Sequence, residues 1–160
     1  MRATYMNALK KILVLLMLAT VAFIFIQSSM SPEKSAEQSD KVGEIVEEII
    51  PPDTTAGEFV KLNLRKIAHF VEFALLGLEI SAYVCLFARR KNVILASYPL
   101  ALFIAFFDET IQIFSGRGSS VKDVWLDFLG FSTASAIVYI AVFSVLFVSK
   151  RMSEGKSVRQ

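Results

Sequence analysis

The sequence predicts an all-α membrane protein with four transmembrane helices. More than half of its 160 residues are hydrophobic (54%), and only 20% are charged. The apolar residues occur in long blocks, whereas soluble helices show periodic apolar positions. Residues 1–160 are therefore expected to form one membrane domain. The net charge of +2 and the lack of a basic stripe with interleaved aromatic residues argue against nucleic acid as a partner.

The first predicted span covers about residues 10–28, where Lys10 and Lys11 precede a short apolar run. A positive start followed by an apolar run is also typical of a secretory signal peptide. Phe25 and Gln27 stand where a cleavage site would need small residues. We therefore expect this span to be retained in the membrane rather than cleaved.

A polar segment at 29–64 follows, and its second half predicts a short amphipathic helix. Hydrophobic residues recur there at helical spacing, and glutamates fill the opposite face. The hydrophobic positions are Val42, Ile45, Val46, Ile49 and Ile50. Pro51 and Pro52 then end the helix. Such a helix would lie on the membrane surface or over the bundle, although a solvated helix without a role is an alternative.

Three further apolar blocks predict the remaining spans, at about 66–88, 93–114 and 121–148. Pro99 lies inside the third span and is expected to kink it. A polar, basic tail occupies residues 149–160.

The positions of lysine and arginine predict the orientation, because cytoplasmic loops carry an excess of both. Three groups of them belong on the cytoplasmic side, namely those before the first span, between the second and third spans, and after the fourth span: Arg2, Lys10, Lys11, Arg89, Arg90, Lys91, Lys150, Arg151, Lys156 and Arg159. Four spans with both termini in the cytoplasm place all of them inside. The segment 29–64 and the turn at 115–120 are then extracytoplasmic.

Polar side chains interrupt three of the four spans, at a cost of about 2.5–3.5 kcal/mol for each charged residue. They are His69 and Glu72, then Asp108, Glu109 and Gln112, then Asp123 and Asp127. With a rise of 1.5 Å per residue, all of them lie roughly 7–18 Å to the outer side of the membrane midplane. Spacings of three or four residues put each set on one helix face. We therefore expect one polar cluster in the outer leaflet, with Lys66 and Arg117 near it.

The order and spacing of these residues resemble the VanZ-like family of bacterial membrane proteins, which is named for an accessory teicoplanin-resistance protein. The resemblance rests on the segments 25–29, 65–73, 108–112 and 116–130, which contain Ser28, His69, Asp108, Gly116 and Arg117 among others. It implies a four-span protein of the bacterial cell membrane, linked to low-level glycopeptide resistance. It does not imply a particular reaction.

Three interpretations of the polar cluster remain open from the sequence. It could be an ion-pair and hydrogen-bond network that fixes helix register, with Arg117 and Lys66 neutralising some acids. It could bind a lipid headgroup, since arginine and lysine hold phosphate. It could be an intramembrane enzyme, with His69, Glu72, Asp108 and Glu109 as catalytic or metal-binding candidates. Transport is a fourth option, for which four spans offer little room.

We predict that the cluster engages lipid-linked cell-wall precursors or lipophilic glycopeptides and contributes to glycopeptide resistance. The expected ligand-binding residues are Lys66, His69, Glu72, Asp108, Glu109, Gln112, Arg117, Asp123 and Asp127. The alternative is a metal-dependent hydrolase or transferase acting on a lipid headgroup, with magnesium or manganese favoured over zinc. The sequence does not identify the ligand, a divalent cofactor or the oligomeric state.

Overall fold

The computed structural model describes residues 2–88 and 91–157, and every regular element in these ranges is a helix. The elements are α1 (Arg2–Ser28), α2 (Pro32–Ile49), α3 (Thr55–Tyr83), a π-helical turn η1 (Val84–Ala88), α4 (Lys91–Phe114) and α5 (Val121–Ser157). Four segments are long and apolar enough to cross a membrane: Thr4–Ser28, Thr55–Ala88, Lys91–Phe114 and Val121–Met152. The predicted all-α fold with four membrane helices is confirmed.

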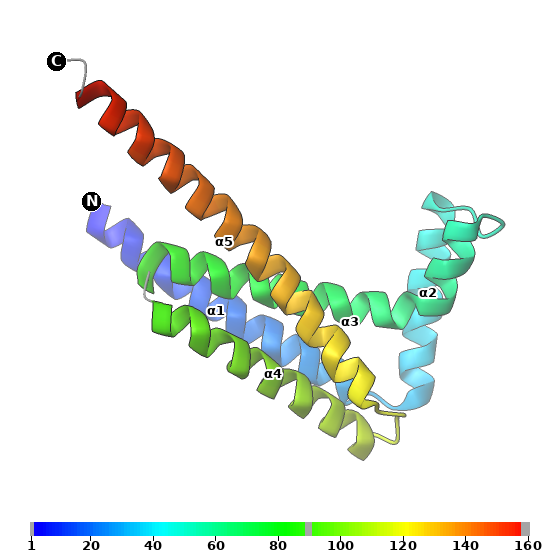
Figure 1. Cartoon of the computed structure of the whole chain (residues 1–160). Coiled ribbons are helices and arrows are strands. Elements are labelled where there is room, and N and C mark those ends of the chain that lie inside the picture. The colour runs from blue at the N-terminus through cyan, green and yellow to red at the C-terminus, as the bar shows by residue number, and fades with distance from the viewer. Residues whose placement is uncertain (1, 89–90, 158–160) are drawn as a thin grey trace.

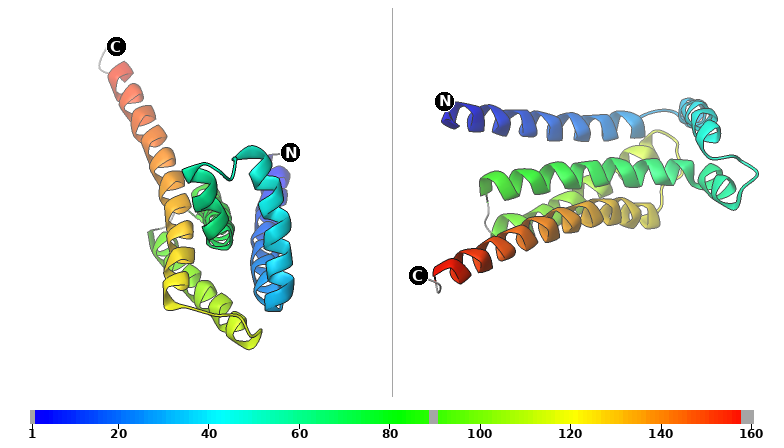
Figure 2. Two further views of the ribbon diagram at one scale, coloured as in Figure 1. Left: turned by 90° about the vertical axis from the view of Figure 1, so that its right-hand side faces the viewer. Right: turned by 90° about the horizontal axis from the view of Figure 1, so that it is seen from above.

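The four long helices α1, α3, α4 and α5 form one bundle, and α2 lies across one end of it (Figure 1). Both ends of the chain lie at the opposite end of the bundle, and the two further views show the same arrangement (Figure 2). Arg89, Arg90 and Arg159, which contributed to the predicted orientation, lie outside the described residues. The orientation itself stays a prediction.

Three helices extend beyond the spans expected from hydropathy. α1 begins at Arg2 rather than near residue 10. α3 begins at Thr55 rather than near residue 66, because the Thr54 hydroxyl caps it by accepting a hydrogen bond from the Gly57 amide at 3.0 Å. Residues 55–64, expected in the polar segment, are therefore helical. α5 continues to Ser157, through most of the expected tail.

The segment before α3 contains a helix, but that helix is longer than the sequence suggested. α2 begins at Pro32, where Ser31 serves as N-cap and a proline at the first position suits helical geometry. It ends at Ile49, next to the two prolines. Whether α2 lies on a membrane surface remains a prediction.

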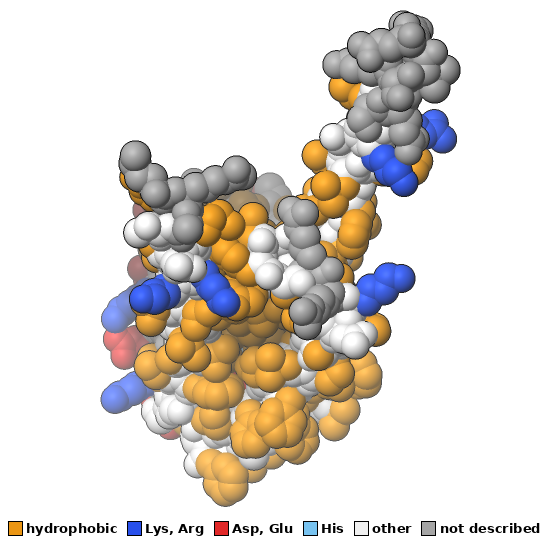
Figure 3. All heavy atoms as spheres, turned by 90° about the vertical axis from the view of Figure 1, so that its left-hand side faces the viewer, with side chains coloured by type: hydrophobic (Ala, Val, Ile, Leu, Met, Phe, Trp, Pro, Cys, Tyr) orange, Lys and Arg blue, Asp and Glu red, His pale blue; other side chains and the backbone are white. Residues whose placement is uncertain are grey.

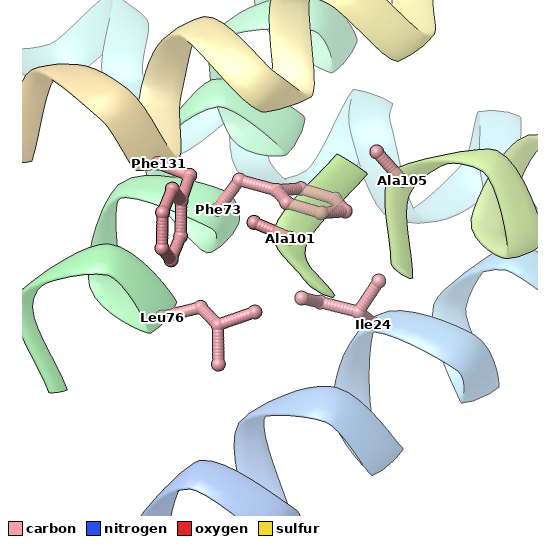
Figure 4. Close-up of a cluster of buried hydrophobic side chains, with 6 residues drawn as sticks. All are labelled: Ile24, Phe73, Leu76, Ala101, Ala105 and Phe131. Carbon is pink, nitrogen blue, oxygen red and sulfur yellow. The ribbon is translucent and has the colours of Figure 1, made fainter. Parts of the chain in front are cut away.

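The hydrophobic core lies where α1, α3, α4 and α5 meet (Figure 4). Its members have no exposed surface: Ile24, Phe73, Leu76, Ala101, Ala105 and Phe131. Tyr98 packs edge-on against Phe131, with ring centroids 5.7 Å apart. Small alanines on α4 let the larger side chains of its neighbours fill the space between the helices.

α3 and α5 make the most extensive helix contact in the bundle. Two glycines permit it, because a Cβ atom on Gly77 would meet the Phe131 carbonyl and one on Gly130 would meet the Phe70 carbonyl. Ser135 on α5 donates a hydrogen bond to the Gly77 carbonyl at 3.3 Å. Small residues at a close helix crossing are typical of membrane bundles.

Large hydrophobic side chains cover much of the outer surface. Seen from the end where both termini lie, apolar side chains fill most of the face and basic side chains project at its margin (Figure 3). Leu15, Ile26 and Phe143 are each more than half exposed. A lipid bilayer is the environment that such a surface requires.

Candidate functional site

His69 on α3 lies between two carboxylates that come from different helices. Its Nδ1 atom is 3.4 Å from Oδ2 of Asp108 on α4 and 3.7 Å from Oδ1 of Asp127 on α5. Both aspartates have no exposed surface, and the histidine side chain is 14% exposed. The three predicted polar faces therefore converge, and they do so near the end of the bundle where α2 lies.

Asp108 is held from two sides. The Ser28 hydroxyl, at the end of α1, donates a hydrogen bond to Oδ1, and Nε2 of Gln112 donates to Oδ2 at 3.1 Å. Ser28 is also fully buried. α1 thus contributes directly to the order of the buried acids.

Gln112 connects both acids of α4 to an arginine. Its Nε2 atom donates to Oε1 of Glu109 at 2.8 Å, and its Oε1 atom accepts from Nη2 of Arg65 at 2.8 Å. The second oxygen of Glu109 accepts from the Ser120 amide at 3.1 Å. The amide side chain suits this position because it can donate to carboxylates and accept from a guanidinium at once.

Arg117 lies in the loop between α4 and α5, after a turn in which Gly116 has a φ of 76°. Its side chain is buried, and Nη1 donates to the Gln27 carbonyl at 2.8 Å. Its Nε atom has no hydrogen-bond partner. Burial, joined by the charge of Arg65, lowers the pKa of Arg117 below its ordinary value. Arg117 therefore ties α1 to this loop, and it forms no direct ion pair with an acid within residues 2–88 and 91–157.

The structure leaves three predicted residues at the edge of the cluster. Glu72 is partly buried and its Oε2 atom has no hydrogen-bond partner. Asp123 is partly exposed and Lys66 is exposed. From here on, the polar cluster means the buried or partly buried residues His69, Glu72, Asp108, Glu109, Gln112, Arg117 and Asp127, without Lys66 and Asp123.

Cations compensate the acids of the polar cluster only in part. Within residues 2–88 and 91–157, neither Glu72, Asp108, Glu109 nor Asp127 forms an ion pair with a lysine or arginine. In the same ranges, both oxygens of Asp127 lack a hydrogen-bond partner although the side chain is fully buried. Leaving buried charged groups unsatisfied is costly, and the neutralisation by Arg117 and Lys66 that the sequence suggests does not occur through direct ion pairs in the described ranges.

Two cavities open onto the cluster. One of about 190 Å³, here called the polar cavity, is lined by Arg65, Lys66, His69, Glu109, Gln112, Asp123 and Asp127 among others. The second, of about 250 Å³, is lined by Gln27, Arg65, His69, Glu72 and Arg117 together with residues of α2. His69 and Arg65 border both, so the cluster is reachable from two sides.

An apolar groove of about 550 Å³ is lined by residues of α4, of α5 and of the loop between them, and Glu109 is one of the lining residues. Its walls include Phe103, Phe106, Ile113 and Trp125. Glu109 also lines the polar cavity. A polar cavity and a lipid-facing groove therefore meet at one carboxylate.

Several contributors were not among the sequence candidates. Ser28, Arg65 and Ser120 each make a hydrogen bond within the cluster. Arg65 could have been inferred, because it precedes His69 by four residues and shares its helix face. Nothing in the local sequence indicates that the Ser120 backbone amide would bind Glu109.

Three side chains of the polar cluster are close enough together to bind one metal ion. His69, Asp108 and Asp127 each offer one ligand atom, and these atoms lie within 4.8 Å of one another. Glu109 was a further candidate from sequence, but both of its oxygens already accept hydrogen bonds from Gln112 and Ser120.

A model of the VanZ/LLP1 family matches residues 13–145. This range includes all four long helices in large part and every residue of the polar cluster. No curated protein and no solved structure matches the chain. The match supports the resemblance seen in the motifs, and the chain belongs to the VanZ/LLP1 family.

Proposed function

We propose that the chain binds an amphiphile at the outer face of a bacterial membrane and thereby contributes to glycopeptide resistance. The amphiphile would carry a polar, sugar-bearing headgroup and a long apolar chain. Lipid-linked cell-wall precursors and lipophilic glycopeptides such as teicoplanin share this chemistry. The family match and the four spans support a membrane protein of the VanZ/LLP1 family, and the ligand and the link to resistance are the proposal.

One observation carries the proposal: the polar cavity and the apolar groove share Glu109 as a wall. Glu109 therefore borders both a space for a headgroup and a space for an apolar chain. The groove walls are phenylalanine, isoleucine and tryptophan side chains, which suit an acyl or prenyl chain. A site that served only to hold the helices together would need neither opening.

The cavity offers complementary groups for a phosphorylated sugar. Arg65 and Lys66 supply positive charge at its rim, and Lys66 forms no ion pair in the described part of the chain. Guanidinium and ammonium groups bind phosphate through charge-assisted hydrogen bonds. Asp123 provides acceptors for hydroxyl or amide hydrogens of the sugar and peptide.

The charge pattern supports an outward-facing site. The first part of α1, the start of α4 and the last part of α5 lie toward the end of the bundle that holds the termini, which we assign to the cytoplasm (Figure 1). These parts of the sequence contain Lys10, Lys11, Lys91 and Lys150. α2, with its glutamates, lies at the other end (Figure 1). The polar cluster then faces the compartment in which cell-wall precursors are used and glycopeptides act.

The test is the teicoplanin inhibitory concentration of a susceptible host that expresses the wild type, Glu109→Gln or Glu48→Gln. Membrane levels of the three proteins are matched. Glu48 is exposed on α2, so its variant makes the same chemical change away from the site. We expect protection by the wild type and Glu48→Gln and its loss in Glu109→Gln. Equal protection by all three would refute a role for the site.

A reaction on the bound headgroup is the second candidate function. The favouring observation is that His69 lies against two buried carboxylates and also lines the polar cavity. Such a group can act as general base or acid. Release of phosphate or of the headgroup from a lipid-linked precursor by purified protein, and its loss in His69→Gln, would establish turnover. Binding without release would leave the protein a binder.

A further inference from the structure

We propose that His69, Asp108 and Asp127 bind one divalent metal ion of the Mn²⁺ or Zn²⁺ type. This site goes beyond amphiphile binding and can be tested without any lipid ligand.

The geometry suits one ion held by three ligands. Nδ1 of His69 is 3.4 Å from Oδ2 of Asp108 and 3.7 Å from Oδ1 of Asp127, and all the ligand atoms lie within 4.8 Å of one another. Zinc binds nitrogen and oxygen ligands at about 2.0–2.2 Å, so neighbouring ligand atoms stand roughly 3–3.5 Å apart. Small side-chain movements would bring all three atoms onto one ion.

The buried atoms around this point lack partners. Among the residues that the structure describes, neither oxygen of Asp127 has a hydrogen-bond donor and Nδ1 of His69 has no hydrogen-bond partner. Asp127 is fully buried. More than nine-tenths of buried polar groups in proteins are hydrogen-bonded, so an unpartnered buried carboxylate next to an unpartnered imidazole nitrogen needs an explanation. A metal ion would satisfy all three atoms at once.

The charge balance points the same way. When both are ionised, Asp108 and Asp127 bring two negative charges into a place with no ion-paired lysine or arginine in the described ranges. A protonated histidine would offset one of them. A divalent cation bound to neutral histidine would offset both, at the centre of the group rather than at one side.

Neighbouring side chains already orient one ligand in the way that metal sites require. Ser28 and Gln112 hold the Asp108 carboxylate through hydrogen bonds. Such support from outer residues fixes ligand position in known metal centres. The polar cavity, which His69 and Asp127 line, gives an ion a path to the site and leaves room for water in its open positions.

The donor set selects the kind of metal. One imidazole and two carboxylates suit Mn²⁺ and Zn²⁺, whereas Cu⁺ prefers thiolates. Ca²⁺ needs six to eight oxygen ligands, which three side chains do not supply. Three protein ligands with open coordination positions are the arrangement of catalytic rather than structural zinc sites.

The test uses the full chain, purified in detergent and stripped with a chelator. Zn²⁺ and Mn²⁺ are titrated separately, the bound metal is counted by elemental analysis, and the dissociation constant is measured by calorimetry. We expect about one ion per chain for at least one of the two metals. Asp127→Asn should weaken binding at least tenfold, while Asp53→Asn, the same change at an exposed loop position, should leave it unaltered.

Spectroscopy of the wild type keeps the proposal testable if Asp127→Asn fails to fold. Co²⁺ or Mn²⁺ in the site should show nitrogen coordination from His69, and this signal should vanish in His69→Gln. Failure of both metals to bind the wild type, or equal binding by Asp127→Asn, would overturn the metal site. Amphiphile binding measured in the presence of chelator would then still decide the proposed function separately.

Discussion

Replacing Gln112 with glutamate should destabilise the bundle markedly, although the two side chains have nearly the same size. Gln112 donates to Asp108 at 3.1 Å and to Glu109 at 2.8 Å, and only 2% of the residue is exposed. A carboxylate cannot donate either bond and adds a third negative charge to the two it faces.

The magnitude follows from these contacts. A hydrogen bond to a charged group contributes about 1.5–3 kcal/mol, and two are lost. Arg65, which donates to Gln112 at 2.8 Å, would gain a carboxylate partner and offset part of the loss. A protonated glutamic acid would retain one donated bond. We therefore expect a net loss of about 2–4 kcal/mol, or roughly 5–15 °C in Tm for a chain of this length.

The assay is thermal unfolding of purified wild type, Gln112→Glu and Gln38→Glu, followed by circular dichroism in the same detergent. Gln38 lies exposed on α2, so its variant controls for the added charge. Unchanged Tm for Gln112→Glu would refute the reasoning, because the two acids would then not depend on the amide for their hydrogen bonds.

Three further predictions concern the α3–α5 crossing, the hydrogen bond of Ser28 and the start of α2. Gly130→Val should lower the free energy of unfolding by about 1–3 kcal/mol or more, because the valine side chain would meet the Phe70 carbonyl at the α3–α5 crossing. Thermal unfolding measures this loss. Ser28→Ala should cost about 1.5–3 kcal/mol by removing the donor to Asp108, with Ser29→Ala as the control, whose hydroxyl bonds only to its own helix. The pKa of Glu33 is lowered by a hydrogen bond from its own backbone amide. The ionised side chain therefore stabilises the start of α2 at neutral pH, and this stabilisation is lost as the pH falls through the lowered pKa. An NMR titration of the α2 amides would show the lowered pKa, and a titration at the ordinary pKa of glutamate would contradict it.

The sequence predicted which helices would bring polar groups together. The depth of each residue followed from a constant helical rise, and spacings of three or four residues gave the shared faces. Those two rules are sufficient for His69, Asp108 and Asp127, which the structure places within ion-pair distance. They need no knowledge of loops or side-chain rotamers.

The same rules could not predict which groups would actually pair. Arg117 was a plausible partner for the acids, yet its guanidinium donates to the Gln27 carbonyl. The fold of a loop decides that contact, and a loop has no periodicity from which to infer direction. Ser28 was known only as part of a motif, because helix rotation determines whether a hydroxyl meets Asp108.

The ends of some helices also could not be predicted from hydropathy. Hydropathy placed the start of the second span near residue 66, because Lys61 and Asn63 are polar. The helix instead begins at Thr55, and the capping hydroxyl of Thr54 sets that start. A polar first turn hides the start of a helix from hydropathy alone, whereas a capping residue next to Pro51 and Pro52 marks it.

The most direct test of the central claim is binding of a polyprenyl-diphosphate-linked disaccharide peptide to the protein in lipid nanodiscs. Wild type, Lys66→Gln and Lys34→Gln are compared, because both lysines are exposed but only Lys66 lines the polar cavity. We predict saturable binding, a Kd about five- to tenfold weaker in Lys66→Gln, and no change in Lys34→Gln. Absence of saturable binding, or the same Kd for all three proteins, would contradict a headgroup site in the polar cavity.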